Sequence, residues 1–167
     1  MIAVRRVVIA RSMFKSALTS PACIKPHQTI TPINVRVKRF SAENQDIRKM
    51  VDPRKVVNFD DVMKGIEHPD KVIIDVRNPD EVSATGKIPS SINIPLGNVE
   101  SVLNSMSETD FERQYQRRKP RHSNELIFYC RSGRRSTEAL DKALKLGYTN
   151  SKTYIGSWEE WSSRTKK

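Results

Sequence analysis

Short apolar runs alternate with helix-like segments along most of the chain. Residues 71–77 (KVIIDVR) and 125–130 (ELIFYC) are continuous runs rich in β-branched and aromatic side chains. Continuous rather than alternating apolar character predicts strands that are buried on both faces, as in a parallel sheet covered by helices. Shorter strands are predicted at residues 91–95 (SINIP) and 152–155 (KTYI), and an extended piece at residues 55–58.

Helix signals fill the segments between these strands. Asp60 is placed to cap a short helix after the first extended piece, and the turn at residues 78–81 (NPDE) starts another helix, which Gly86 closes. Shorter helical pieces are expected near residues 99–106 and 110–116. Each predicted strand is therefore followed by a segment able to cover the sheet.

A longer helix is predicted from Ser136 onward, because apolar residues recur there at helical spacing and Gly147 stands where a helix commonly ends. The stretch 156–161 (GSWEEW) starts a last helix, whose two tryptophans are expected to serve packing. This alternation predicts an α/β fold with a mostly parallel central sheet flanked by helices on both faces. Cys130 would then lie at the carboxyl end of a strand, where such folds place ligands.

Charge is distributed unevenly along the chain, whose formal net charge is +11. Residues 1–40 hold eight of the 30 Lys and Arg and none of the 19 Asp and Glu, so residues 41–167 carry 22 basic against 19 acidic residues. A basic, acid-free start with interleaved apolar and hydroxylated residues is typical of a mitochondrial presequence. We expect residues 1–40 to be a cleaved presequence, residues 41–53 a connector and residues 54–167 one domain.

The composition of the predicted presequence also indicates where the protein is located. Arginines interrupt every apolar stretch, so neither a secretory signal nor a membrane span is predicted, and no membrane partner is expected. Arg39 precedes a candidate processing site after Phe40. These features predict a protein that is soluble after import into the mitochondrion, with the matrix as its compartment. We also expect a monomer. The alternative is a basic tail that has no targeting role.

A second basic stretch, residues 117–121 (RRKPR), raises the question of nucleic acid. It has no interleaved aromatic residues and contains a proline, so a solvated connector is expected and no nucleic-acid partner is predicted. If this loop folded over a pocket at the carboxyl ends of the strands, its charge would favour an anionic molecule there.

Cys130 is the residue whose side chain is most clearly suited to a chemical reaction. Cleavage of the presequence would remove Cys23 and leave Cys130 as the single thiol, without an internal disulfide. His27, His68 and His122 are not spaced with other ligands as metal sites require, and they are expected at the surface. The sequence therefore predicts neither a metal nor another cofactor.

The residues after Cys130 favour a reactive thiol over a cysteine that merely ends a buried strand. Helix amino ends and neighbouring arginines stabilise thiolates, and a glycine lets a loop curl around an anion. The stretch 129–136 (YCRSGRRS) offers both features between a strand and a helix. The predicted active-site loop after Cys130 comprises Arg131, Ser132, Gly133, Arg134, Arg135 and Ser136.

With this loop the chain resembles the rhodanese (thiosulfate sulfurtransferase) family, and in particular its small single-domain members. The family loop runs Cys-Arg-x-Gly-x-Arg or Thr, and Cys130, Arg131, Gly133 and Arg135 match every fixed position. The resemblance implies a single rhodanese-like domain.

Two further motifs extend the resemblance to roughly residues 54–164. The stretch 75–95 is similar to the family pattern DVR…E…GHIPGAINIP, and the stretch 156–161 is similar to a motif near the end of the domain. The chain departs from the pattern at a few positions. Lys87 stands in place of His, Ser90 and Ser91 in place of Gly and Ala, and Ser157 in place of a common Gly.

The resemblance implies a sulfurtransferase of sulfide metabolism. The Cys130 thiolate would take the outer sulfur of thiosulfate or a persulfide and hold it as a persulfide. Cyanide, glutathione or a protein thiol would accept it, and thioredoxin or glutathione would act as an external reductant. In related enzymes the arginine matched by Arg77 helps to hold the anionic donor; an ion pair with a neighbouring acid is the alternative for Arg77.

Two other functions fit parts of this pattern. Cysteine phosphatases and arsenate reductases of the same fold have arginine six positions after the cysteine and commonly histidine before it, where this chain has Ser136 and Tyr129. The shorter loop suits one sulfur atom better than a phosphoryl group. A non-metabolic rhodanese module that carries persulfide or acts in redox regulation remains the alternative function.

Overall fold

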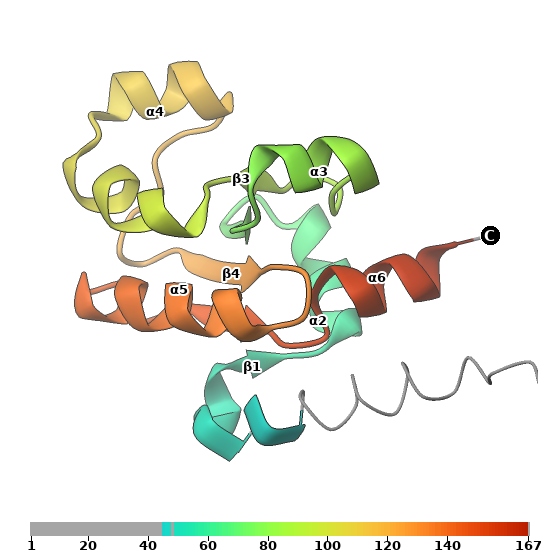
Figure 1. Cartoon of the computed structure of the whole chain (residues 1–167). Coiled ribbons are helices and arrows are strands. Elements are labelled where there is room, and N and C mark those ends of the chain that lie inside the picture. The colour runs from blue at the N-terminus through green and yellow to red at the C-terminus, as the bar shows by residue number, and fades with distance from the viewer. Residues whose placement is uncertain (1–44, 48, 167) are drawn as a thin grey trace, which may run out of the picture. The chain divides into compact units, whose positions relative to one another are not determined.

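The computed structural model describes residues 45–47 and 49–166, so the predicted presequence at residues 1–40 lies outside the described residues (Figure 1). Five parallel strands form one sheet in the order β1-β5-β4-β2-β3. The strands are β1 (Val56–Val57), β2 (Lys71–Asp75), β3 (Ile92–Asn93), β4 (Glu125–Tyr129) and β5 (Lys152–Tyr154). The predicted strands and their parallel arrangement are confirmed.

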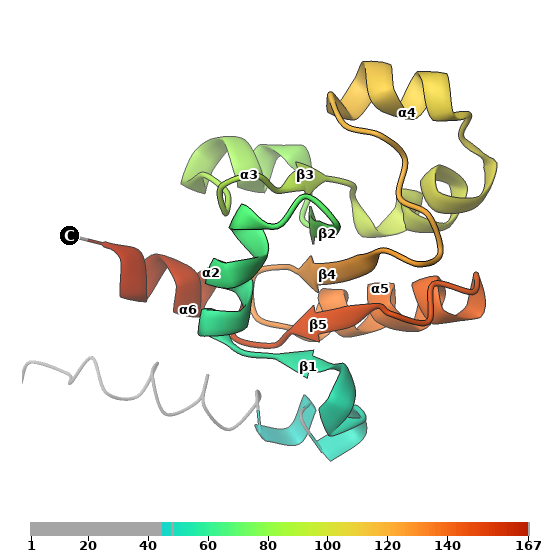
Figure 2. The ribbon, with the colours of Figure 1, turned by 180° about the vertical axis from the view of Figure 1, so that it is seen from behind.

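Helices follow the strands as the periodicity predicts. The longer ones are α2 (Phe59–Glu67), α3 (Pro79–Thr85), α4 (Glu108–Tyr115), α5 (Arg134–Lys145) and α6 (Ser157–Thr165). The shorter turns are η1 (Pro53–Lys55), η2 (Leu96–Asn98) and η3 (Ser101–Ser105). Helix α5 lies in front of the sheet in Figure 1, and α2 lies in front of it in Figure 2, so the two faces are covered by different helices.

Two helix starts differ from the prediction. The cap of α2 is Asn58 rather than Asp60: the Asn58 side chain accepts from the Asp61 N–H at 2.9 Å, and the Asp61 carboxylate accepts from the Asn58 N–H at 3.1 Å. This reciprocal pair forms a capping box, and Asp60 falls in the first turn. Helix α5 starts at Arg134, two residues before Ser136, because Gly133 takes a left-handed conformation and serves as its cap.

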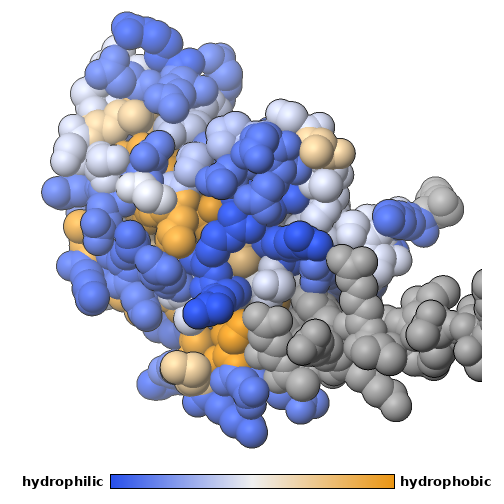
Figure 3. Space-filling model, in the orientation of Figure 1, coloured by the Kyte–Doolittle hydropathy of each residue, from blue (hydrophilic) through white to orange (hydrophobic). Residues whose placement is uncertain are grey.

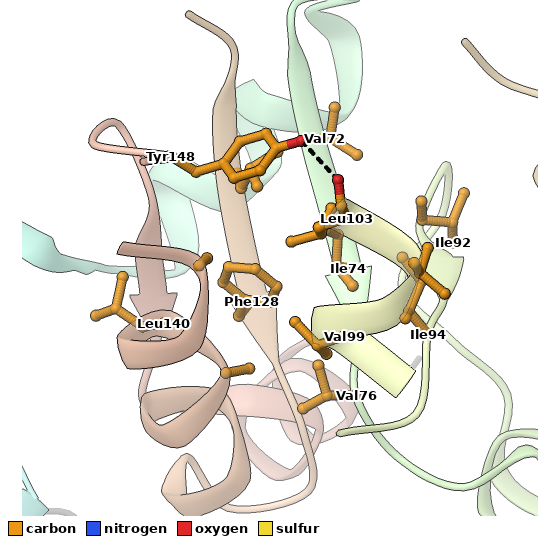
Figure 4. Packing of buried hydrophobic residues seen from close by; sticks show 14 of the residues in the cluster. Val72, Ile74, Val76, Ile92, Ile94, Val99, Leu103, Phe128, Leu140 and Tyr148 are labelled. Atoms are coloured by element: carbon orange, nitrogen blue, oxygen red, sulfur yellow. Dashed lines mark hydrogen bonds between the residues drawn. The ribbon is translucent and has the colours of Figure 1, made fainter. Parts of the chain in front are cut away.

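Alternate residues of the central strands pack into two apolar cores. On one face Ile74 and Phe128 pack with residues of α4, α5 and η3, as Figure 4 shows for part of this cluster. There the Tyr148 hydroxyl donates to the Leu103 carbonyl at 3.3 Å and ties the end of α5 to η3. On the other face Ile73 and Ile127 pack with residues of α2 and α6. The two central strands are therefore buried on both sides, as their continuous apolar sequences predict.

The basic stretch 117–121 lies at the amino ends of the strands. The Arg117 guanidinium donates to the carbonyls of Pro69 and Lys71 at 2.7 and 2.8 Å, just where β2 begins. Cys130 follows the carboxyl end of β4. Because β2 and β4 are parallel, Cys130 and the basic stretch lie at opposite ends of these strands. The idea that this loop folds over the cysteine is wrong, because the hydrogen bonds from the Arg117 side chain hold the loop at the amino ends of the strands.

The face that carries α5 and α6 is largely hydrophilic, with apolar surface exposed in its middle part and again in its lower part (Figure 3). Within residues 45–47 and 49–166, no helix combines the length and apolar character needed to span a bilayer. His68 and His122 are exposed, as expected for surface histidines.

Candidate active site

Cys130 directly follows β4 and is buried, with 1% of its surface exposed. Its Sγ accepts a hydrogen bond from the Gly133 backbone N–H at 3.1 Å. This contact shows that the chain after Cys130 curls back so that a peptide dipole points at the sulfur. A backbone N–H in this position stabilises negative charge on sulfur, as the sequence predicts for the loop.

Gly133 is required at the turn of this loop. Its φ is +94°, and a Cβ built on it would stand 2.5 Å from the Ile155 carbonyl oxygen. Either a positive φ or such an approach alone disfavours a side chain, and both act here. The loop therefore curls tightly only because this residue is glycine.

Ser136 anchors the start of α5 to the sheet. Its hydroxyl donates to the Gly133 carbonyl at 2.9 Å and accepts from the Thr153 hydroxyl of β5 at 2.9 Å. Ser136 and Thr153 are both fully buried. The predicted loop residue Ser136 therefore holds the loop in place and has no exposed surface for a substrate.

The start of α6 holds the cysteine loop from the other side. The Trp158 N–H donates to the Cys130 carbonyl at 3.0 Å, and the Glu159 N–H donates to the Arg131 carbonyl at 3.2 Å. The Ser157 hydroxyl accepts from the Cys130 N–H at 3.2 Å. Sequence reasoning missed this support, because it joins residues 27 positions apart.

Two of the three loop arginines form ion pairs with acids. Arg135 donates to both carboxylate oxygens of Glu81 at 2.6 and 2.8 Å, and this hydrogen bonding lowers the pKa of Glu81 to about 2. Arg131 pairs with Glu159 at 2.9 Å. The predicted cationic field around the thiol is therefore partly neutralised, whereas Arg134 at the first turn of α5 is exposed.

Arg77 is buried, with 1% of its surface exposed, and it pairs with Asp75 at 2.6 Å. Its guanidinium also donates to the Thr85 hydroxyl at 2.9 Å and to the Gly86 carbonyl at 2.8 Å. Burial acts against its charge, but the hydrogen bond and attraction to Asp75 leave the pKa of Arg77 raised. The ion pair that the sequence offered as the alternative for Arg77 is therefore present. Together these contacts connect β2 to the end of α3.

A pocket of about 450 Å³ opens beside the cysteine loop, between α3 and the start of α6. Arg77 contributes to the lining of this pocket, and its guanidinium lies 4.8 Å from the centre of the Trp158 ring. The pocket is lined by Arg77, Asp80, Glu81, Ala84, Thr85, Arg131, Trp158 and Glu159. Trp158, expected only to pack, thus also forms a wall of this pocket.

Not every predicted loop residue lies in the same environment. Cys130 and Gly133 are buried, Arg131 lines the pocket, and Ser132 is half-buried beside them. Among the described residues, no three His, Cys, Asp or Glu side chains gather closely enough to hold a metal ion. The site is therefore a thiol at the base of a loop, with mixed charges around the neighbouring pocket.

Comparison with known proteins gives this geometry a family. The chain is 41% identical to a rhodanese domain-containing protein of Drosophila melanogaster, over 65% of this chain and 97% of that one. It is 39% identical to a mitochondrial thiosulfate sulfurtransferase of Saccharomyces cerevisiae, over 66% and 74% of the two chains. A human thiosulfate:glutathione sulfurtransferase is 39% identical over 53% of this chain and 76% of its own.

The fold comparison agrees with the sequence comparison. The solved structure of a human single-domain sulfurtransferase superposes with a TM-score of 0.62 at 32% identity, covering 67% of this chain and 98% of that one. The family profile described as Rhodanese-like domain matches residues 58–164, which include Cys130, its loop and the start of α6. The chain belongs to the rhodanese-like domain family.

Proposed function

We propose that the protein is a sulfurtransferase that moves sulfane sulfur through a persulfide on Cys130. The observation that carries this proposal is the Gly133 N–H directed at the Cys130 sulfur at 3.1 Å, within a loop that matches the rhodanese pattern. Relatives that share this domain are named thiosulfate sulfurtransferases and a thiosulfate:glutathione sulfurtransferase. Their names favour thiosulfate as donor and glutathione as one acceptor.

The reaction has two steps that balance without a cofactor. The Cys130 thiolate attacks the outer sulfur of thiosulfate, the sulfur–sulfur bond of thiosulfate breaks, and sulfite leaves with the bonding electron pair. Cys130 then carries a persulfide whose outer sulfur is anionic. A nucleophilic acceptor takes that sulfur, giving thiocyanate from cyanide or a persulfide from glutathione or a protein thiol, and the thiolate returns.

The pocket beside the loop supplies the approach for donor and acceptor. Arg77, Arg131 and Trp158 line it, and the Trp158 N–H donates to the Cys130 carbonyl. We assign donor positioning to Arg131, Arg134 and the loop amides. Arg77 acts in the same site by fixing the Trp158 wall, and contact with the donor is its further proposed role.

The spacing of the loop supports sulfur transfer over phosphate chemistry. Arg135 stands five positions after Cys130, and Ser136 occupies the sixth. Arg135 is also held by Glu81, so its guanidinium is not free to grip a phosphoryl group. Phosphate release from an aryl phosphate by the purified protein would instead support a phosphatase function.

We further propose that the protein acts in the mitochondrial matrix after removal of residues 1–40. The acid-free basic composition of that segment supports this location, as does the mitochondrial label of the yeast relative. A fluorescent reporter fused to residues 1–45 is expected to enter mitochondria; a reporter that stays in the cytosol would sink this part of the proposal.

The decisive experiment compares the full chain carrying Cys23→Ser with the same chain carrying Cys130→Ser as well. Thiosulfate is supplied with cyanide or glutathione, and the intact protein is weighed by mass spectrometry. The first protein should gain one sulfur atom and form thiocyanate or glutathione persulfide, and the second should do neither. A persulfide that no small acceptor removes would favour the persulfide-carrier alternative.

A further inference from the structure

A groove of about 680 Å³ lies at the amino ends of β2 and β4, away from Cys130. One of its walls is the connection from α4 to β4, which can be followed in Figure 2, and the other is the turn before β2. The charged residues in its lining are Asp70, Arg117, Arg118, Lys119 and Arg121, four cations against one carboxylate. We call this concavity the basic groove.

The arginines of the basic groove differ from most other arginines of the protein. Ion pairs with carboxylates are formed by Arg54, Arg77, Arg113, Arg131, Arg135 and Arg164. Within residues 45–47 and 49–166, Arg117, Arg118 and Arg121 form none, and the same holds for Arg134 outside the groove. The arginines without a carboxylate partner are therefore concentrated in one place.

Two of the four cations have a structural role. Arg117 Nη2 donates to the two backbone carbonyls at the start of β2, and Lys119 Nζ donates to the Met106 carbonyl at 2.7 Å. Arg118 and Arg121 are exposed, and in the described part of the chain their side chains donate to no protein acceptor. The fold thus accounts for Arg117 and Lys119 and leaves the other two guanidinium groups available to a ligand.

Hydrogen bonds hold the basic stretch in a fixed shape. The Arg121 N–H donates to the Asn124 side chain at 2.8 Å, and the Asn124 amide donates to the Asp70 carbonyl at 3.2 Å. The Tyr148 hydroxyl donates to the Pro120 carbonyl at 3.3 Å. A loosely attached connector would let its like charges move apart, whereas here they are held together in a concavity, which concentrates positive potential. A site held in this way binds without a large cost of ordering.

The composition of the groove indicates the chemistry of its ligand. Guanidinium groups pair best with phosphate and carboxylate groups. A phosphate monoester carries about −1.5 to −2 charges at pH 7, so two phosphate groups balance the excess of cations where several carboxylates would be needed. No aromatic side chain is among the described residues that line the groove, so it lacks the stacking surface with which proteins hold the bases of single-stranded nucleic acids.

We propose that the basic groove binds a compact ligand with two or three phosphate groups, held mainly by Arg118 and Arg121. The Nε and Nη1 groups of Arg117 donate to no acceptor in residues 45–47 and 49–166 and add donors at the same place. The ligand is either a free di- or triphosphate compound or a lipid headgroup with two phosphates. This inference concerns binding alone and does not rest on the proposed sulfur transfer.

The test titrates inorganic triphosphate into the full chain at pH 7 and low salt, with binding measured by calorimetry. The groove variant carries Arg118→Gln with Arg121→Gln, and the matched control carries Arg54→Gln with Arg113→Gln. Arg54 and Arg113 are exposed arginines outside the lining of the groove. Both variants lose the same charge and keep the basic residues 1–40, so nonspecific attraction changes equally in the two.

The groove variant should bind triphosphate at least about tenfold more weakly than the parent, and the control should stay within about twofold. Orthophosphate should bind the parent at least about tenfold more weakly than triphosphate, because it engages fewer guanidinium groups. The urea midpoint and the rate of sulfur transfer of the groove variant should match those of the parent, since its two side chains hold nothing in the fold. A groove variant that binds less because it unfolds is thereby recognised.

A second arm of the test distinguishes the sources of the phosphate groups. Vesicles of phosphatidylcholine are sedimented with the protein, with and without about one fifth of diphosphatidylglycerol, a lipid with two phosphates. Loss of binding specific to the groove variant, with triphosphate or with these vesicles, supports the proposal and names the source.

Three results would overturn it. These are equal weakening in both variants, orthophosphate bound as tightly as triphosphate, and no binding in either arm. Displacement of triphosphate by an acidic peptide or a single-stranded oligonucleotide of higher affinity would also overturn it, because the groove would then serve a macromolecule.

Discussion

The Arg135 guanidinium donates two hydrogen bonds to the Glu81 carboxylate, of 2.6 and 2.8 Å. Glu81 lies in the first turn of α3, where its side chain also accepts from the Asn78 N–H, and Arg135 lies in the first turn of α5. One carboxylate thus joins the helix that follows β2 to the helix that follows the cysteine loop. Breaking this pair should loosen the loop without touching the thiol.

Glu81→Gln should lower the free energy of unfolding by about 1–2 kcal/mol at pH 7, after discounting for solvent screening of this half-buried pair. The folded-state pKa of Glu81 is lowered to about 2, so its contribution is present above the unfolded-state pKa near 4.5 and is lost as the pH falls toward 2. Urea unfolding of both proteins at pH 7 and pH 3 measures the difference. A gap between the two proteins that widens at pH 3 would contradict this assignment.

Gly133→Ala should destabilise the fold by about 2–4 kcal/mol and abolish sulfur transfer, because it combines a positive φ with a steric clash. The clash is with the Ile155 carbonyl, 2.5 Å from the added Cβ. Gly147→Ala is the matched control, since its φ is +89° but its Cβ would meet only the His122 side chain, at 3.4 Å. The free energy of unfolding of the control should fall by about 1 kcal/mol, and its activity should be kept. Equal losses of stability in the two variants would contradict a clash at Gly133.

Arg77→Met should destabilise the protein by about 3–5 kcal/mol, since it leaves the buried Asp75 carboxylate without its partner. Adding Asp75→Asn to this variant should restore part of the loss, because the buried charge is then gone. A double-mutant cycle by urea unfolding, read together with KM for thiosulfate, separates stability from donor binding. A rise in KM without loss of stability would assign Arg77 to the donor instead of the fold.

Arg118→Glu combined with Arg121→Glu should leave kcat/KM for thiosulfate within about twofold of the parent at 0.15 M salt. Strand β4 has five residues, so its two ends are about 16 Å apart, whereas exposed charges are screened over about 8 Å. Steady-state sulfur transfer measures the effect. A tenfold drop in kcat/KM would show that the charge of residues 117–121 affects sulfur transfer.

The strands were predictable because their apolar runs are local and continuous. Residues 125–130 contain β4, the central strand of the sheet, and residues 71–77 contain its neighbour β2. The cap of α2 was harder, because Asn58, Asp60 and Asp61 are all good capping residues and only backbone geometry decides which side chain reaches which N–H. Local sequence thus located the helix and left its first residue open.

The cysteine loop was predictable as a motif, but its supports were not. Gly133 could be anticipated from the need for a curled turn. The pairing of Arg135 with Glu81 joins residues 54 positions apart, and the bond between Ser157 and Cys130 joins residues 27 apart. Neither carries a periodic signal, because such contacts arise only when the sheet brings distant segments together.

Residues 155–159 complete the surroundings of the Cys130 sulfur, which lies earlier in the chain. The Ile155 carbonyl, the Ser157 hydroxyl and the amides of Trp158 and Glu159 all meet the loop that follows β4. During synthesis from the amino end, Cys130 therefore emerges before the segment that shapes its surroundings. A nascent or prematurely terminated chain would contain the thiol but lack this scaffold, so the sulfur transfer proposed for Cys130 requires residues 155–159 as well.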